Sequence, residues 1–165
     1  MQTSTKFILP LLIAGALLFL WLNLTQKVQA PDITFTTIDN KKISMASLKG
    51  KVVLVNFWAS DCTSCIKEMP YLASLYRTYK ASGFEVINVA MQYDPPAQVL
   101  NYATLKALPF PIMHDGFGAV SAAFGGIEAT PTAFVFDKNG HRLLQATGVL
   151  DFASLKQLLD IELAK

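Results

Sequence analysis

Histidine, cysteine and charged side chains are all scarce in this chain of 165 residues, which has two histidines, two cysteines and 16 % charged residues. A structural zinc site needs four ligands. The cysteine pair could recruit only His114 and His141, neither at a metal-ligand spacing, so we expect no metal site. The net charge of +2 comes without a basic cluster, which argues against nucleic-acid binding. No nicotinamide or flavin motif occurs, so we expect no bound organic cofactor.

The two cysteines, Cys62 and Cys65, are three residues apart and follow the apolar run Val52–Trp58 closely. Such a run is typical of a buried strand, and the residues after Cys62 are typical of a helix. The first thiol would then lie at a helix N-terminus, where unpaired N–H groups favour a thiolate. The second thiol lies one turn further on, close enough to close a disulfide. This arrangement predicts a redox centre.

The N-terminal part of the chain is strongly apolar, with no charged or polar side chain from Phe7 to Leu22. As a helix, residues 7–24 would span roughly 27 Å, which is near the hydrocarbon thickness of a bilayer. Trp21 suits an interfacial position. We therefore expect residues 1–30 to form a signal anchor and short linker that contacts the lipid bilayer through residues 7–24.

A cleaved signal peptide is the alternative, because Val28-Gln29-Ala30 resembles a cleavage site. However, the apolar run is longer than the usual core of a signal peptide. Pro31 would also follow the cut, and its fixed φ and missing N–H suit a protease poorly. We favour the uncleaved anchor.

Residues 31–165 are long enough to bury a core as one domain. Apolar alternation and turn residues predict strands at 33–38, 41–45, 52–58, 84–91, 112–113, 132–136 and 142–147. They also predict helices at 62–80, 95–108 and 117–124, with a last helix capped by Asp151. Because helices alternate with buried strands, we expect an α/β fold in which helices cover both faces of a sheet.

Four segments carry a family resemblance: Asn56-Phe57-Trp58-Ala59, Cys62-Thr63-Ser64-Cys65, Glu68-Met69-Pro70 and Ala129-Thr130-Pro131-Thr132. With them the chain resembles the thioredoxin superfamily and, within it, the membrane-anchored TlpA/ResA-like thiol–disulfide oxidoreductases. The resemblance extends over essentially all of residues 31–165. It implies a thioredoxin-like three-layer sandwich, with a central mixed sheet flanked by helices, an N-terminal β-hairpin and an extra helix insertion. One N-terminal transmembrane helix would precede this domain.

The resemblance implies roles for individual residues. Cys62 matches the attacking thiol and Cys65 the buried resolving thiol of a redox-active disulfide. Pro131 matches a cis-proline that faces this disulfide and, with the backbone of Thr130, holds the substrate chain as an added strand. Glu68 matches an acidic residue that takes the Cys65 proton through a water. We expect Trp58 to be a core residue that also shields the disulfide and belongs to the substrate site.

Two positions depart from the common pattern of the superfamily. Asn56 replaces the buried aspartate of many thioredoxins and cannot titrate, which makes Glu68 the better candidate for the base. Asp61 replaces an aromatic residue before the first cysteine, and its carboxylate is expected to raise the pKa of Cys62. A stabilised reduced form makes a dithiol more oxidising. Because Asp61 would destabilise the thiolate of the reduced form, it favours a reductase. Thr63 and Ser64 would also tune the reduction potential of the cysteine pair, but its value cannot be read from these two residues.

We therefore expect a reductase of protein disulfides outside the cytoplasm, with substrates of the apocytochrome c kind implied by the resemblance to proteins of cytochrome c maturation. Its electrons would come from a membrane donor of the DsbD/CcdA kind. The protein would be a single-pass protein of the cytoplasmic (inner) membrane, with the catalytic domain facing the periplasm or the cell exterior.

Other functions fit the residues less well. A peroxidase of this fold needs a threonine where Ala59 stands and a proline further upstream, and residues 51–61 contain none. A Sco-type copper(I) chaperone would use the cysteines as soft ligands, but with one more residue between them and a downstream histidine. Ile66 excludes haem attachment, which needs a histidine there. A purely structural disulfide would close too short a loop to contribute much stability.

Overall fold

The structure, a computed structural model, describes residues 12–17, 20 and 27–165. Within these residues, seven strands occur in chain order: β1 (Thr34–Thr36), β2 (Lys42–Ser44), β3 (Val52–Trp58), β4 (Phe84–Ala90), β5 (Ile112–His114), β6 (Thr132–Phe136) and β7 (Arg142–Thr147). The helices are α2 (Thr63–Tyr79), α3 (Pro96–Leu105), α4 (Ala119–Ala123) and α5 (Phe152–Leu163), with 3-10 turns at Met45–Leu48 and Lys80–Ser82.

A five-stranded mixed sheet in the order β5-β4-β3-β6-β7 forms the centre of the domain. Strands β3, β4 and β5 are parallel, whereas β6 is antiparallel to both β3 and β7. Strands β1 and β2 form a separate antiparallel hairpin, and Thr37 just beyond β1 forms a bridge to Met113 of β5. The predicted α/β architecture with its N-terminal hairpin is confirmed.

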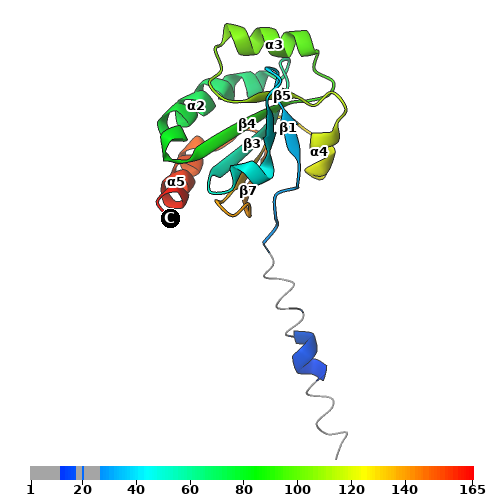
Figure 1. The fold of residues 1–165 in the computed structure, drawn as a ribbon, viewed down its shortest axis with the longest axis vertical. Helices are drawn as coiled ribbons and strands as arrows, with labels where there is room; N and C mark the ends of the chain where they lie inside the picture. The colour runs from blue at the N-terminus through cyan, green and yellow to red at the C-terminus, as the bar shows by residue number, and fades with distance from the viewer. Residues whose placement is uncertain (1–11, 18–19, 21–26) are drawn as a thin grey trace, which may run out of the picture.

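Alternate side chains of β3 enter two separate apolar layers. Val52, Leu54 and Trp58 pack toward α2 and α5, together with Leu72 and Leu155 among others. Val53, Val55 and Phe57 pack on the opposite face, in a layer that includes Phe35, Val120 and Phe134. In Figure 1, α2 and α5 lie on one side of the sheet, whereas β1 and α4 lie on the other. Since every residue of β3 is buried, this strand is fixed from both faces.

Most predicted element boundaries agree with the structure to within a few residues. The hairpin at 132–136 and 142–147 is confirmed, and Asp151 caps α5 through its side chain. Helices α3 and α4 are shorter than predicted. Helix α3 ends at Leu105, because Ala107 takes a positive φ and the next residues turn toward β5. Helix α4 is bounded by Gly118 and by Gly125-Gly126, all with positive φ.

The predicted membrane segment, residues 7–24, lies largely outside the described residues. Of this segment, residues 12–17 and 20 are described, and they are helical and exposed. Within the described ranges, no helix combines the length and the apolar character needed to cross a bilayer.

Candidate active site

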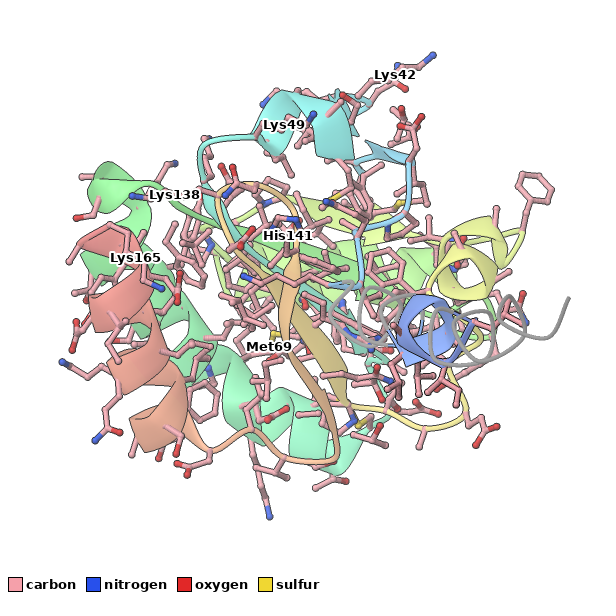
Figure 2. All side chains as sticks on the ribbon, turned by 90° about the horizontal axis from the view of Figure 1, so that it is seen from below. Lys42, Lys49, Met69, Lys138, His141 and Lys165 are labelled. Carbon is pink, nitrogen blue, oxygen red and sulfur yellow. A yellow bond between two sulfur atoms is a disulfide. The ribbon has the colours of Figure 1, made fainter. Side chains whose placement is uncertain are left out.

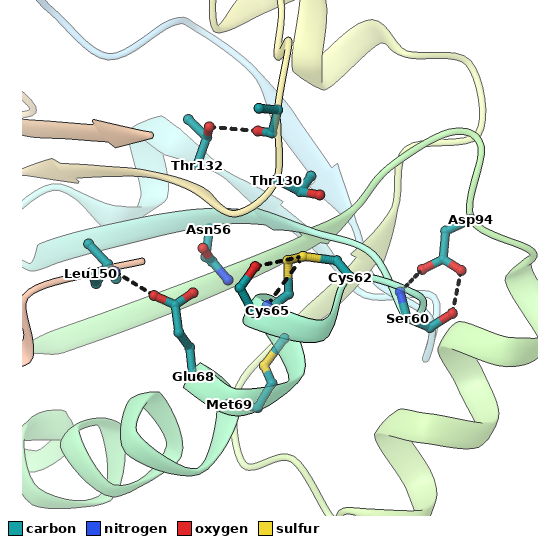
Figure 3. Close-up of a disulfide and its surroundings, with 12 residues drawn as sticks. Asn56, Ser60, Cys62, Cys65, Glu68, Met69, Asp94, Thr130, Thr132 and Leu150 are labelled. Atoms are coloured by element: carbon teal, nitrogen blue, oxygen red, sulfur yellow. Dashed lines mark hydrogen bonds between the residues drawn. A yellow bond between two sulfur atoms is a disulfide. The ribbon is translucent and has the colours of Figure 1, made fainter. Parts of the chain in front are cut away.

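The redox pair lies where β3 passes into α2. Cys62 is the N-cap of α2, and its Sγ accepts a hydrogen bond of 3.2 Å from the backbone N–H of Cys65. The two sulfurs form a disulfide, with the Cα atoms 5.2 Å apart (Figure 3). Cys62 is partly exposed, whereas Cys65 is 1 % exposed. Because the helix N-terminus surrounds Cys62 with N–H groups, this sulfur is the one whose thiolate the fold stabilises and solvent reaches.

The peptide bond between Thr130 and Pro131 is cis, as the resemblance implied. Pro131 is buried, and its carbonyl accepts a hydrogen bond of 2.8 Å from the N–H of Gly148. The hydroxyls of Thr130 and Tyr93 are 3.4 Å apart. Thr132 fixes the turn from the other side, since its hydroxyl donates to the carbonyl of Ala129 (2.7 Å; Figure 3). The backbone next to the disulfide is therefore held from two neighbouring segments.

Glu68 is buried in α2, with only 4 % of its surface exposed. Its Oε1 accepts a hydrogen bond of 2.5 Å from the N–H of Leu150, whereas Oε2 has no partner among the described residues (Figure 3). Burial raises the pKa of the Glu68 carboxyl above its ordinary value, and the hydrogen bond from Leu150 opposes this only in part. Glu68 is thus not a solvated surface charge, which was the alternative to its catalytic role.

Asn56 of β3 is buried at the position where many thioredoxins have an aspartate. Its Nδ2 donates to Oδ1 of Asn88 at 2.8 Å, and Nδ2 of Asn88 lies 3.5 Å from the sulfur of Met69. Neither amide titrates. Glu68, three residues after Cys65, is the carboxyl group of α2 that is nearest to Cys65 along the chain. Because the amides do not titrate, Glu68 stays the candidate for the base.

Asp94 fixes the loop that leads to Cys62, a contact that the sequence analysis did not find. The buried carboxylate accepts hydrogen bonds of 2.6 Å from both the backbone N–H and the hydroxyl of Ser60 (Figure 3). The carbonyl of Asp94 is in turn 2.8 Å from Nε2 of His114. Asn88 was also missed as a site residue, although a polar residue in an otherwise apolar strand is a usable signal. Asp94 gives no such signal, because it lies in a loop.

An open cavity of about 770 Å³ lies beside the disulfide. It brings together most of the predicted site residues: Asp61, Cys62, Thr63, Ser64, Glu68 and Thr130. Four further lining residues, which were not predicted, are apolar or aromatic: Tyr71, Tyr93, Val149 and Phe152. The cavity can therefore receive a chain whose sulfur reaches Cys62 while its neighbouring side chains contact an apolar wall.

Trp58 does not belong to this cavity. Its side chain is 0 % exposed and packs against Tyr102, with the ring centroids 5.4 Å apart. The end of β3 turns its side chain into the core, as expected, whereas its contribution to the substrate site stays a prediction. Trp58 lies in the same apolar layer as Cys65.

Metal ligands do not gather at this site. Among residues 12–17, 20 and 27–165, no group of three or more histidine, cysteine, aspartate or glutamate side chains is arranged to hold a metal ion. His141 pairs instead with Asp137, at 3.1 Å.

Comparison with known proteins identifies the family. The Redoxin family model matches residues 25–157. The thiol-disulfide oxidoreductase ResA of Bacillus thuringiensis (strain Al Hakam) is 36 % identical over 120 residues, which cover 73 % of this chain and 68 % of ResA. The crystal structure of a thiol:disulfide interchange protein of the thioredoxin family from Chlorobium tepidum TLS superposes with a TM-score of 0.77 at 30 % identity, covering 84 % of this chain and 98 % of that one. StoA from Bacillus subtilis gives a TM-score of 0.66 at 25 % identity, covering 80 % and 98 %.

The pKa of Glu68 generates a prediction about stability. The pKa of Glu68 in the folded state lies above the unfolded-state value of 4.5. Between these two values the folded protein binds more protons than the unfolded chain. The free energy of unfolding therefore falls as pH rises through that range. Glu68→Gln removes this ionisation but keeps an acceptor for Leu150. We expect the unfolding free energy of the oxidised wild type to decrease relative to that of Glu68→Gln as pH rises from about 4 to 8. Denaturant unfolding at a series of pH values measures this; a pH-independent difference would contradict it.

Proposed function

Since this chain belongs to the Redoxin family and is a thiol–disulfide oxidoreductase, we propose that it acts mainly as a reductase of protein disulfides. The observation that carries this proposal is the Cys62–Cys65 pair at a helix N-terminus, with its outer sulfur facing the same cavity as Thr130. A metal-free dithiol at such a place can perform thiol–disulfide exchange with no further group.

The proposed reaction has two exchange steps. The Cys62 thiolate attacks one sulfur of the substrate disulfide, forms a mixed disulfide and releases the other substrate sulfur as a thiolate. Cys65 then loses its proton and attacks Cys62, which releases the second substrate thiolate and leaves the Cys62–Cys65 disulfide. Two electrons pass from the dithiol to the substrate. An external dithiol must then supply two electrons to reduce the Cys62–Cys65 disulfide before the next cycle.

We assign substrate positioning to the backbone around Thr130 and Pro131. Thr130 lines the cavity beside the disulfide, and its backbone N–H and C=O have no backbone hydrogen-bond partner among the described residues. An extended substrate chain can therefore pair with it as an added strand.

We assign the proton transfer of the second step to Glu68. Its raised pKa makes it a better proton acceptor for a thiol than an ordinary surface carboxylate. A water that bridges Cys65 and the free Oε2 would carry the proton. Glu68→Gln is expected to slow the release of the mixed disulfide by about 10²-fold or more, with little effect on the attack by Cys62. Rapid-quench alkylation separates the two steps, and an unchanged release rate would rule out this role.

Trapping tests the proposed function directly. In Cys65→Ala the mixed disulfide at Cys62 cannot resolve, so the full chain expressed in cells is expected to carry covalent protein adducts that dithiothreitol releases. Cys62→Ala serves as the matched control and is expected to carry none, because Cys65 is buried. Mass spectrometry identifies the adducts. A stoichiometric copper(I) complex without protein adducts would instead support the copper chaperone.

The direction of electron flow rests on Asp61, which is exposed next to Cys62. Its negative charge disfavours the Cys62 thiolate and hence the reduced form. We expect Asp61→Asn to raise the reduction potential by about 10–30 mV, the equivalent of roughly 0.5–1.4 kcal/mol. Asp32→Asn, the same change at an exposed residue of the N-terminal segment, is expected to leave the reduction potential unchanged. Equilibration with glutathione measures both, and a strongly oxidising wild type would contradict the proposed direction.

The remaining assignments concern the location of the protein. We propose that residues 1–30 anchor residues 31–165 to the outer side of the cytoplasmic membrane, through residues 7–24, and that a membrane donor of the DsbD/CcdA kind returns the electrons. Substrates of the apocytochrome c kind fit this location. The apolar character of residues 7–24 and the similarity to ResA support these proposals. The same trap tests the location, since adducts with cytoplasmic proteins alone would contradict it.

A further inference from the structure

We propose that the cavity beside Cys62 selects substrate disulfides that lie in positively charged segments of polypeptide and have an apolar side chain next to the cysteine. This inference rests on the proposed function and adds the class of substrate to it. It is drawn from the charges and apolar groups around the cavity.

The apolar part of the cavity is unusually exposed. Tyr71, Tyr93 and Val149 have 63 %, 58 % and 66 % of their surfaces exposed, although each lines the cavity beside the disulfide. Tyr71 stacks on Phe152, with the ring centroids 5.4 Å apart, so that α2 and α5 share one aromatic wall. Exposed apolar surface of this kind marks an interaction site. A side chain adjacent to the substrate cysteine would cover it while the sulfur reaches Cys62.

The charges around the same cavity are mainly negative. Asp61 lines it and is exposed, and two further exposed acids adjoin it in the chain: Asp151, directly before Phe152, and Glu128, two residues before Thr130. Hydrogen bonds from Ser154 lower the pKa of Asp151, so this carboxylate is ionised at neutral pH. Lys67 is the single basic residue in the lining. A cationic segment is therefore attracted to the cavity and an anionic one is repelled.

A second observation points to a polar ligand here. Glu68 lines the cavity, and its buried Oε2 has no hydrogen-bond partner in the described part of the chain. A buried carboxylate oxygen without a partner is costly. The water proposed for the proton transfer can supply the missing bond, and a polar group of a bound chain can in turn bind that water.

The opposite end of the domain carries several lysines, of which Lys165 is paired with Glu162. Gly50, just before β3, donates a hydrogen bond to the carbonyl of Lys138 (2.8 Å), so the start of β3 and the β6–β7 turn lie together. Figure 2, seen from below, labels four lysines on this side of the domain, namely Lys42, Lys49, Lys138 and Lys165. The seven residues of β3 separate this end from Cys62 by roughly 20 Å. That is more than twice the Debye length of about 8 Å at physiological ionic strength, so the lysines do not neutralise the cavity.

Model substrates test the charge preference. Full-chain protein in detergent, with dithiothreitol as the electron donor and a protein-free blank, is assayed with synthetic peptides that contain one disulfide, one neighbouring phenylalanine and flanks of either lysine or glutamate. We expect kcat/KM to be about tenfold higher for the lysine peptide at low salt, and the ratio to approach about 1 near 0.5 M salt. Replacing the phenylalanine by serine in the lysine peptide should lower kcat/KM several-fold.

Two matched variants of α5 locate the effect. Asp151→Asn removes one charge beside the cavity but keeps a residue that caps helices well. Asp160→Asn makes the same change in net charge, nine residues further along α5 and roughly 13 Å away along its axis. We expect Asp151→Asn to reduce the ratio of kcat/KM for the lysine peptide to kcat/KM for the glutamate peptide about two- to threefold. Asp160→Asn is expected to leave this ratio unchanged.

The outcomes separate this inference from the function on which it rests. If neither peptide is reduced, the proposed reductase itself is wrong. If both peptides are reduced equally well at low salt, or the glutamate peptide is preferred, the charge preference is wrong and the reductase stands. If Asp151→Asn and Asp160→Asn change the ratio equally, the preference reflects net charge and not this cavity, which also overturns the inference.

Discussion

The hydrogen bond from the backbone of Cys65 to the sulfur of Cys62 is the interaction on which the site depends. It exists because Cys62 is the N-cap of α2, which begins at Thr63. The helix follows closely on β3, which ends at Trp58 and is completely buried between two apolar layers. The strand fixes where the chain emerges from the sheet. The helix then turns its unpaired N–H groups toward the first sulfur and carries the second sulfur into the core. Different reactivity of two identical thiols follows from this geometry alone.

Around the disulfide, each neighbouring segment is held by a polar contact from elsewhere in the fold. Asp94 binds the loop before Cys62, Gly148 binds Pro131, and Leu150 binds Glu68. These contacts place the partly exposed sulfur of Cys62, the backbone at Thr130–Pro131 and a buried carboxyl group at one end of the sheet. Among the described residues, two buried side-chain oxygens remain without hydrogen-bond partners, on Asn56 and Glu68. Unsatisfied buried acceptors are unfavourable for stability, and the proposed proton transfer would give the one on Glu68 a function.

The distribution of charge adds a second level of organisation. Several lysines lie on the side of the domain where β3 begins, and the exposed carboxylate of Asp61 lies at the end that bears Cys62, with the strand as the spacer. Such an arrangement costs little stability, because exposed charges interact weakly over these distances. It does act on an approaching chain, whose charge decides which end it meets first.

The sequence by itself determined what depends on short-range signals. The spacing of Cys62 and Cys65 after an apolar run predicted the redox pair, the turn at Asp137–Gly140 predicted the last hairpin, and Asp151 predicted the start of α5. The family resemblance at Thr130–Pro131 predicted the cis peptide bond. Each of these features lies within a few residues of its cause, so spacing, caps and turn residues are enough to find it.

Only the tertiary structure decided which distant residues meet at the disulfide. Glu68 and Leu150 are 82 residues apart, and Ser60 and Asp94 are 34 apart. Their contacts depend on the strand order β5-β4-β3-β6-β7, which no local pattern specifies. The same holds for the contact of Trp58 with Tyr102 and for the aromatic wall shared by Tyr71 and Phe152. A side chain's neighbours across a fold are set by how whole strands and helices pack, and that packing is a property of the complete chain.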